Sequence, residues 1–155
     1  MNKTNVIRLL EANKIPHDIK TYIVDEDDLS GISVAQKIGV DEDIVFKTLV
    51  IEGDRSGIII FCVPVNLELN LKKAAVVGSN KKVELIPTKN LLAVTGYIRG
   101  GCSPIGMKKK YPTFVDETAK LFDKIYFSAG LRGIQVGIHP DILQILTGSV
   151  FADLT

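Results

Sequence analysis

Short apolar segments alternate with polar or glycine-containing turns along this chain of 155 residues. The two longest apolar segments lie near the middle. Residues 44–51 are rich in β-branched side chains and contain one cation, and residues 58–63 (IIIFCV) follow after a turn at residues 53–57. Two such runs around a glycine-containing turn predict a β-hairpin. Because successive residues are apolar in both runs, we expect burial on both faces and helices that cover the sheet.

The flanking segments predict further strands and short helices. Alternation of apolar and polar residues predicts strands at 17–24 and 132–138. Short apolar segments predict further strands at 83–86, 113–115 and 124–127, and an edge strand at 150–154. Side chains of the N-cap type predict helix starts at Thr4, Ser33, Asn70, Thr88 and Asp116, and Pro140 opens a last helix at 141–146. Gly39, Gly96 and Gly148 end three of these helices. The pattern indicates one α/β domain, residues 1–155, built around a mixed sheet.

Composition places the chain among globular proteins, since 46% of its residues are hydrophobic and 24% are charged. No apolar segment approaches the roughly 18 residues of a membrane-spanning helix, and the polar N-terminus lacks a signal-peptide core. Two cysteines without a CxxC pair do not form a disulfide framework. We therefore expect a reduced, cytoplasmic protein.

Charge is distributed unevenly, although the net charge is only +1. Residues 66–112 contain nine Lys or Arg against two acids. Such a basic region can bind a polyanion, and phosphate is the commonest one. The alternative is a set of solvated lysines scattered over several faces.

A glycine-containing stretch, residues 96–110 (GYIRGGCSPIGMKKK), has neither helical nor strand periodicity and predicts a loop. It is either a plain connection or a binding loop, since long irregular loops in compact domains usually bind something. The amides of Gly100 and Gly101 can hold a carbonyl oxygen on which negative charge develops, at about 2.7–4 kcal/mol per donor. Cys102 is a candidate nucleophile if the nearby lysines lower its pKa, although no base is visible and a small packing role is the alternative.

Lys47 lies within an apolar strand, where an ammonium is costly unless it meets an anion or water. It either extends to an edge or faces a cleft, where it would hold a substrate carbonyl or phosphate. His17 and His139 stand alone, without ligand spacing or a nucleophile motif. Fingerprints of nucleotide cofactors are missing from the sequence. We therefore expect no metal and no cofactor.

Three segments together resemble the YbaK/EbsC family: FKTLV at residues 46–50, GYIRGGCSPIGMKK at 96–109 and SAGLRGIQV at 128–136. Its members are freestanding aminoacyl-tRNA deacylases related to the editing domain of bacterial prolyl-tRNA synthetases. The resemblance implies a single YbaK-like domain, with a mostly antiparallel, barrel-like sheet surrounded by short helices. It implies hydrolysis of mischarged Cys-tRNA(Pro) in trans, beside prolyl-tRNA synthetase as a transient partner. In this family the substrate's own thiol attacks the ester, so no protein nucleophile is needed.

The resemblance also implies roles for individual residues. Lys47 matches the signature lysine, and Gly100 and Gly101 match the carbonyl-binding glycines. Candidates for substrate binding are Tyr22, Phe46, Cys102, Ser128 and Gln135. Gln135 replaces an aspartate of some relatives, which removes a charge from any acid–base or amine-binding role there. Arg99, Lys108 and Lys109 would face the acceptor end of tRNA. Two alternatives stay open: a deacylase for another small amino acid such as alanine, and a non-catalytic tRNA-binding module.

Overall fold

The computed structural model describes residues 3–155. Five α-helices form within them: α1 (Asn5–Ala12), α2 (Gly31–Ile38), α3 (Leu71–Val77), α4 (Leu91–Thr95) and α5 (Pro140–Thr147). Eight strands are present in the same range: β1 (Asp18–Thr21), β2 (Phe46–Gly53), β3 (Gly57–Pro64), β4 (Val83–Leu85), β5 (Thr113–Asp116), β6 (Ile125–Ser128), β7 (Ile134–Ile138) and β8 (Val150–Ala152). No helix in residues 3–155 has both the length and the apolar character needed to cross a membrane.

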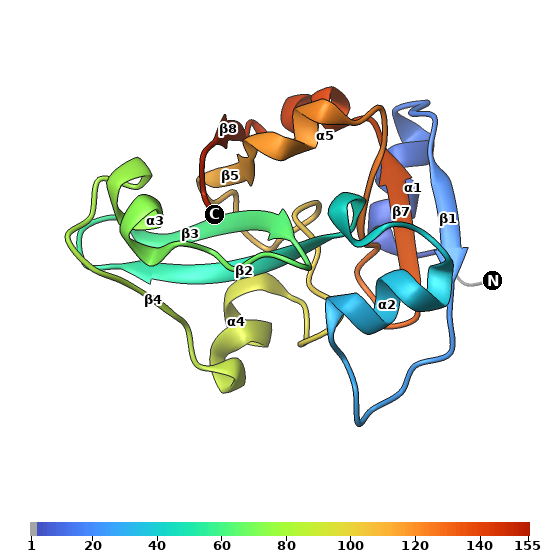
Figure 1. The fold of residues 1–155 in the computed structure, drawn as a ribbon, viewed down its shortest axis with the longest axis horizontal. Helices are drawn as coiled ribbons and strands as arrows, with labels where there is room; N and C mark the ends of the chain where they lie inside the picture. Colours follow the sequence, from blue (N-terminus) through green and yellow to red (C-terminus); the bar gives the residue numbers. More distant parts are fainter. Residues whose placement is uncertain (1–2) are drawn as a thin grey trace.

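The strands form two sheets. The larger sheet has the order β4–β2–β3–β5–β8, in which β5 runs parallel to β3 and to β8 and the other pairs are antiparallel. The smaller sheet, β1–β7–β6, is antiparallel throughout. The sheets meet at a bridge between Val45 and Tyr126, at the open end of the β2–β3 hairpin (Figure 1). The predicted α/β fold with a mixed, mostly antiparallel sheet is confirmed, and its strands stay in two sheets without closing a barrel.

The predicted hairpin is present in full register, from Phe46 opposite Pro64 to Gly53 opposite Gly57. Successive residues of β3 point to opposite faces of the sheet. Ile60 and Cys62 join a core that includes residues of α1 and α5, whereas Ile59, Phe61 and Val63 join a second core that includes Ala74 of α3. Both faces of the hairpin are therefore covered, as expected.

Several predicted helix ends are confirmed. Thr4 Oγ1 accepts a hydrogen bond from the Ile7 amide at 3.2 Å, and Asn70 caps α3 in the same way. Gly39, Gly96 and Gly148 each adopt the left-handed conformation that ends a helix.

Other boundaries differ from the prediction. Helix α2 is capped by Ser30, so it begins three residues earlier than expected, and Ser33 donates its amide to the Ser30 hydroxyl at 3.2 Å. Thr88 is not a side-chain cap, because residues Thr88–Asn90 form a 3-10 helix that precedes α4. Strand β1 covers half of the predicted residues 17–24, since only Asp18–Thr21 pair with β7.

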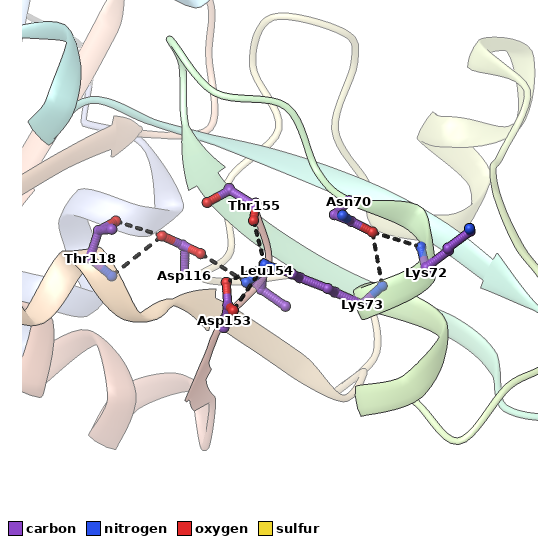
Figure 2. Close-up of polar contacts among 8 residues, drawn as sticks. All are labelled: Asn70, Lys72, Lys73, Asp116, Thr118, Asp153, Leu154 and Thr155. Atoms are coloured by element: carbon purple, nitrogen blue, oxygen red, sulfur yellow. Dashed lines mark hydrogen bonds and ion pairs between the residues drawn. The ribbon is translucent and has the colours of Figure 1, made fainter.

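Residues 153–155, which follow β8, link this strand to α3 and to Asp116 through hydrogen bonds and an ion pair (Figure 2). The Leu154 side chain is fully buried in the second core, its amide donates to Asp116 Oδ1 at 3.0 Å, and its carbonyl accepts from the Asn70 amide at 2.7 Å. Lys73 Nζ lies 2.9 Å from the Asp153 carboxylate. Asp116 also caps the 3-10 helix at Glu117–Leu121, as predicted. The edge strand is thus held from two sides.

Candidate functional site

A cavity of about 450 Å³ opens between strand β2, the amino end of α2 and the glycine-containing loop, residues 96–110. This volume lies within the range of small-molecule binding sites. It is lined by several residues singled out from the sequence: Phe46, Lys47, Arg99, Gly100, Cys102, Ser128 and Gln135. Residues far apart in the sequence therefore share one concave site.

Lys47 reaches the cavity from the second position of β2, opposite Val63 of β3. Its side chain is 26% exposed, and its Nζ lies 3.4 Å from Glu68 Oε1. Glu68 is 92% exposed and follows the end of β3, at the mouth of the same cavity. Because ion pairs with a solvated partner contribute little, this pair is easily displaced. The Lys47 ammonium is therefore available to an anionic or polar ligand.

Gly100 lines the same cavity from the glycine-containing loop, in a tight turn over residues 98–101. The Gly101 amide donates to the Ile98 carbonyl at 3.0 Å and closes the turn. The φ angle of Gly100 is +84°, which at the third turn residue is the signature of a type II turn. Gly101 lies outside the cavity lining and has its amide engaged, so of the two predicted glycine donors only Gly100 lines the cavity.

Three side chains stabilise this loop by donating hydrogen bonds to backbone carbonyls in it or next to it. The Tyr97 hydroxyl donates to the Ile105 carbonyl, and the Tyr111 hydroxyl donates to the Val94 carbonyl at 2.7 Å. Arg132 Nε donates to the Arg99 carbonyl at 2.7 Å. These contacts fix the irregular backbone, which lacks the hydrogen bonds of a helix or a sheet.

Cys102 also lines the cavity, but its chemistry differs from the expectation. Burial raises the pKa of the Cys102 thiol to about 12, because a thiolate is poorly solvated there, and a hydrogen bond with Thr95 opposes the rise only in part. The condition under which Cys102 would be a nucleophile, a pKa lowered by nearby lysines, is therefore not met. At neutral pH the group is a protonated thiol, which favours a wall residue over a nucleophile.

Ser128 and Gln135 are cross-strand partners in β6 and β7. Ser128 Oγ accepts from the Gly130 amide at 3.1 Å. Gln135 is 6% exposed, and within residues 3–155 its Oε1 has no hydrogen-bond partner. A buried amide oxygen without a partner is costly, which indicates that a ligand donor such as an ammonium satisfies it.

Three of the predicted residues lie away from the cavity wall. Tyr22 packs against a separate core of Ala35, Ile38 and Val45, and its ring centre is 5.9 Å from Lys37 Nζ. Lys108 and Lys109 lie farther along the loop, and Lys109 lines a second cavity of about 280 Å³ beside the carboxyl ends of α1 and α5. Of the three cations predicted for tRNA, only Arg99 lines the first cavity.

The sequence analysis missed the contribution of α2. Ser30 and Gly31 line the cavity at the amino end of this helix. Any side chain at Gly31 would overlap Val65, so only glycine lets α2 pack this closely. A glycine at a helix start was the available signal. Among residues 3–155, no three His, Cys, Asp or Glu side chains gather as candidate metal ligands.

Comparison with known proteins defines the family. The model of the aminoacyl-tRNA editing domain matches residues 30–145, most of the chain, and the protein belongs to this family. A similar curated relative is EbsC of Enterococcus faecalis strain V583, which is 46% identical over 153 residues, covering 99% of this chain and 93% of EbsC. EbsC is named as a candidate Cys-tRNA(Pro)/Cys-tRNA(Cys) deacylase. The resemblance inferred from the three segments is confirmed.

Solved structures show the same fold. A candidate trans-editing enzyme for prolyl-tRNA synthetase superposes with a TM-score of 0.82 and 21% identity, covering 100% of this chain and 99% of that one. A hypothetical protein superposes with a TM-score of 0.87 and 22% identity, covering 97% and 99%. At these identities the likeness shows the fold alone.

Proposed function

We propose that this protein is a trans-editing deacylase that removes cysteine from mischarged Cys-tRNA(Pro). The observation that carries the proposal is the composition of the 450 Å³ cavity. It combines the Lys47 ammonium with the Gly100 amide, whereas its Cys102 thiol is held protonated. Such a site stabilises a reacting carbonyl but supplies no ionised nucleophile. The 46% identity with EbsC supports the same assignment.

The missing nucleophile comes from the substrate. The cysteinyl thiol attacks its own ester carbonyl, so that a carbon–sulfur bond forms and the bond to the ribose oxygen breaks. The thiol proton is passed on and ends on that oxygen, which releases intact tRNA and a cyclic thioester. A positioned intramolecular reaction of this kind gains about 7–11 kcal/mol over its bimolecular counterpart.

Each wall of the cavity then has a task. Lys47 and the Gly100 amide face the negative charge that develops on the ester oxygen. Gln135 Oε1, which is buried and unpartnered, accepts a hydrogen bond from the substrate ammonium. A neutral amide orients the amine without competing for its proton.

The partner of the cavity is the acceptor end of a charged tRNA. Arg99, which lines the cavity, supports this assignment because it would meet the terminal phosphates, and Lys108 and Lys109 would add positive charge along the same loop. Action in trans on tRNA(Pro) also suits a transient association with prolyl-tRNA synthetase in the cytoplasm, where charged tRNAs are used.

A deacylation panel tests the proposal. Cys-, Ala- and Ser-charged tRNA(Pro) are incubated with the protein, and the loss of each amino acid is measured. We expect cysteine to be released fastest, with tRNA and cyclic thioester as products. Faster release of alanine or serine would reject thiol assistance and favour the alternative small-residue deacylase. Tight tRNA binding without ester cleavage across the panel would reject an enzyme.

A further inference from the structure

The peptide between Arg99 and Gly100 is the central peptide of the turn over residues 98–101. Type I and type II turns share their end residues and differ mainly by a rotation of this peptide, which exchanges the directions of its carbonyl and its amide. The φ angle of +84° at Gly100 shows that the type II orientation is present. The type I orientation would point the Arg99 carbonyl where the Gly100 amide now points.

Arg132 contacts this peptide directly. Its Nε donates to the Arg99 carbonyl oxygen at 2.7 Å, from a residue that lies 33 positions away in the sequence. Its side chain is 26% exposed, and its Nη1 lies 3.8 Å from Glu26 Oε1, a long contact with a carboxylate that is 81% exposed and therefore contributes little. The carbonyl and the amide of a planar trans peptide point in opposite directions. A hold on the Arg99 carbonyl therefore also fixes the direction of the Gly100 N–H.

The packing shows on which side Arg132 lies. A Cβ atom built on Gly100 would lie 3.2 Å from Arg132 Nε and 3.4 Å from its Cγ. Arg132 therefore backs the turn, while Arg99, Gly100 and Cys102 form the cavity lining. The Gly100 N–H points away from Arg132, which is not among the residues that line the cavity.

We propose that Arg132 is a positioning residue: it locks the Arg99–Gly100 peptide so that the Gly100 N–H meets the ester oxygen of the substrate. This inference rests on the proposed deacylase function. It assigns Arg132 no contact with the substrate, in contrast to an arginine that binds tRNA phosphates. Its loss should then lower kcat and leave KM unchanged.

The first experiment measures kcat and KM for Cys-tRNA(Pro) hydrolysis by Arg132→Gln. We expect kcat to fall about 100-fold, the lower end of the range for a lost oxyanion donor, at unchanged KM. Arg55→Gln removes the same charge from the exposed hairpin turn, and Glu26→Gln removes only the ion pair, so both should keep kcat. A raised KM with unchanged kcat in Arg132→Gln, or an equal kcat loss in either control, would overturn the proposal.

A double-mutant cycle tests the shared mechanism. Gly100→Ala disfavours a positive φ and drives the turn toward type I, so it should lower kcat by a similar factor. If both substitutions turn the same peptide, the Arg132→Gln/Gly100→Ala double variant should lose no more than either single variant. Losses that multiply would show that Arg132 acts elsewhere.

A measurement without catalysis separates the two proposals. The amide resonance of Gly100 in an NMR spectrum of the folded, ligand-free protein should shift in Arg132→Gln and stay in place in Glu26→Gln and Arg55→Gln. If the Gly100 resonance did not shift in Arg132→Gln, the proposal that Arg132 fixes the orientation of the Arg99–Gly100 peptide would be refuted. A wild-type protein that deacylates no charged tRNA would refute the proposed function, and the Gly100 resonance would still report on Arg132.

Discussion

Two parts of the cavity lining position their functional groups differently: strand β2, called the strand wall, positions the Lys47 ammonium, and the loop of residues 96–110, called the loop wall, positions the Gly100 amide. Lys47 lies in a regular strand, and the eight-residue register between β2 and β3 fixes its place. Gly100 lies in an irregular turn, where one backbone hydrogen bond and one arginine side chain fix the peptide. The strand wall depends on many weak contacts, whereas the loop wall depends on a few specific ones. Single substitutions should therefore disturb the geometry of the loop wall more easily than that of the strand wall.

Removing the charge of the strand wall should give the largest effect. Lys47→Ala should lower kcat/KM by about 1,000-fold, because the ester oxygen loses a charged donor in a partly desolvated site. Single-turnover hydrolysis of Cys-tRNA(Pro) measures it. Lys82→Ala, which removes an exposed lysine at the far end of the hairpin, is the matched control and should retain full activity. If both variants lost the same factor in kcat/KM, Lys47 would contribute only nonspecific electrostatic attraction for tRNA and no stabilisation of the ester oxygen.

Loosening the loop wall should give the next effect. Gly106 has a φ angle of +76°, and an added Cβ would approach Tyr97 Oη to 2.9 Å. Gly106→Ala should therefore break the Tyr97–Ile105 hydrogen bond and cost about 1–3 kcal/mol in free energy of unfolding, measured by urea denaturation. Its kcat should fall as well, since the loop carries Gly100. Gly57→Ala tests positive φ alone, because its added Cβ meets no neighbour. If kcat fell equally in Gly106→Ala and Gly57→Ala, the loss would come from backbone strain in general and not from the disturbed loop.

Freeing Lys47 from its counter-ion should have a modest effect. Glu68→Gln removes the carboxylate that lies 3.4 Å from Lys47 Nζ. Because a solvated ion pair contributes at most about 1 kcal/mol, KM for Cys-tRNA(Pro) should decrease by up to about fivefold at unchanged kcat. Glu84→Gln, an exposed site on β4, controls for net charge. A lower kcat in Glu68→Gln would mean that Glu68 orients the ammonium.

Removing the thiol of the loop wall should have the smallest effect. The pKa of Cys102 is about 12, so the thiol stays protonated across the neutral range. Cys102→Ala should lower kcat by less than about threefold, whereas loss of a true nucleophile costs several orders of magnitude. The pH dependence of kcat should likewise be the same in the variant and the wild type. Complete inactivation would restore Cys102 as the nucleophile.

The sequence predicted the strand wall far better than the loop wall. The hairpin follows from two apolar runs around a turn, and Lys47 is conspicuous because it interrupts one of them. Among the predicted caps, Thr4, Asn70 and Asp116 are confirmed. For α2, Ser30 and Ser33 both precede apolar residues, and the cap is Ser30 instead of the predicted Ser33. Local pattern cannot rank such neighbours.

The contact between Arg132 and the Arg99 carbonyl has no sequence signature at all. It joins a side chain to a backbone atom 33 residues away, and no periodicity or spacing rule encodes such a pair. The same holds for the cavity lining by α2, because its direction is set by tertiary packing against Val65. Tyr22, which the resemblance implied for substrate binding, is not among the lining residues but packs against a cluster that includes Val45, which lines the cavity.

The two tyrosine hydrogen bonds, one within the loop and one between the residues that flank it, have a thermodynamic consequence. Fixing a free backbone costs about 1–2 kcal/mol of conformational entropy per residue. If the loop were disordered in the free protein, each binding event would have to include this unfavourable term. Here Tyr97 and Tyr111 order the loop during folding, before tRNA arrives. Each encounter with a mischarged tRNA can then proceed without waiting for a segment to close, which suits an enzyme that must intercept a rare error before the ribosome uses it.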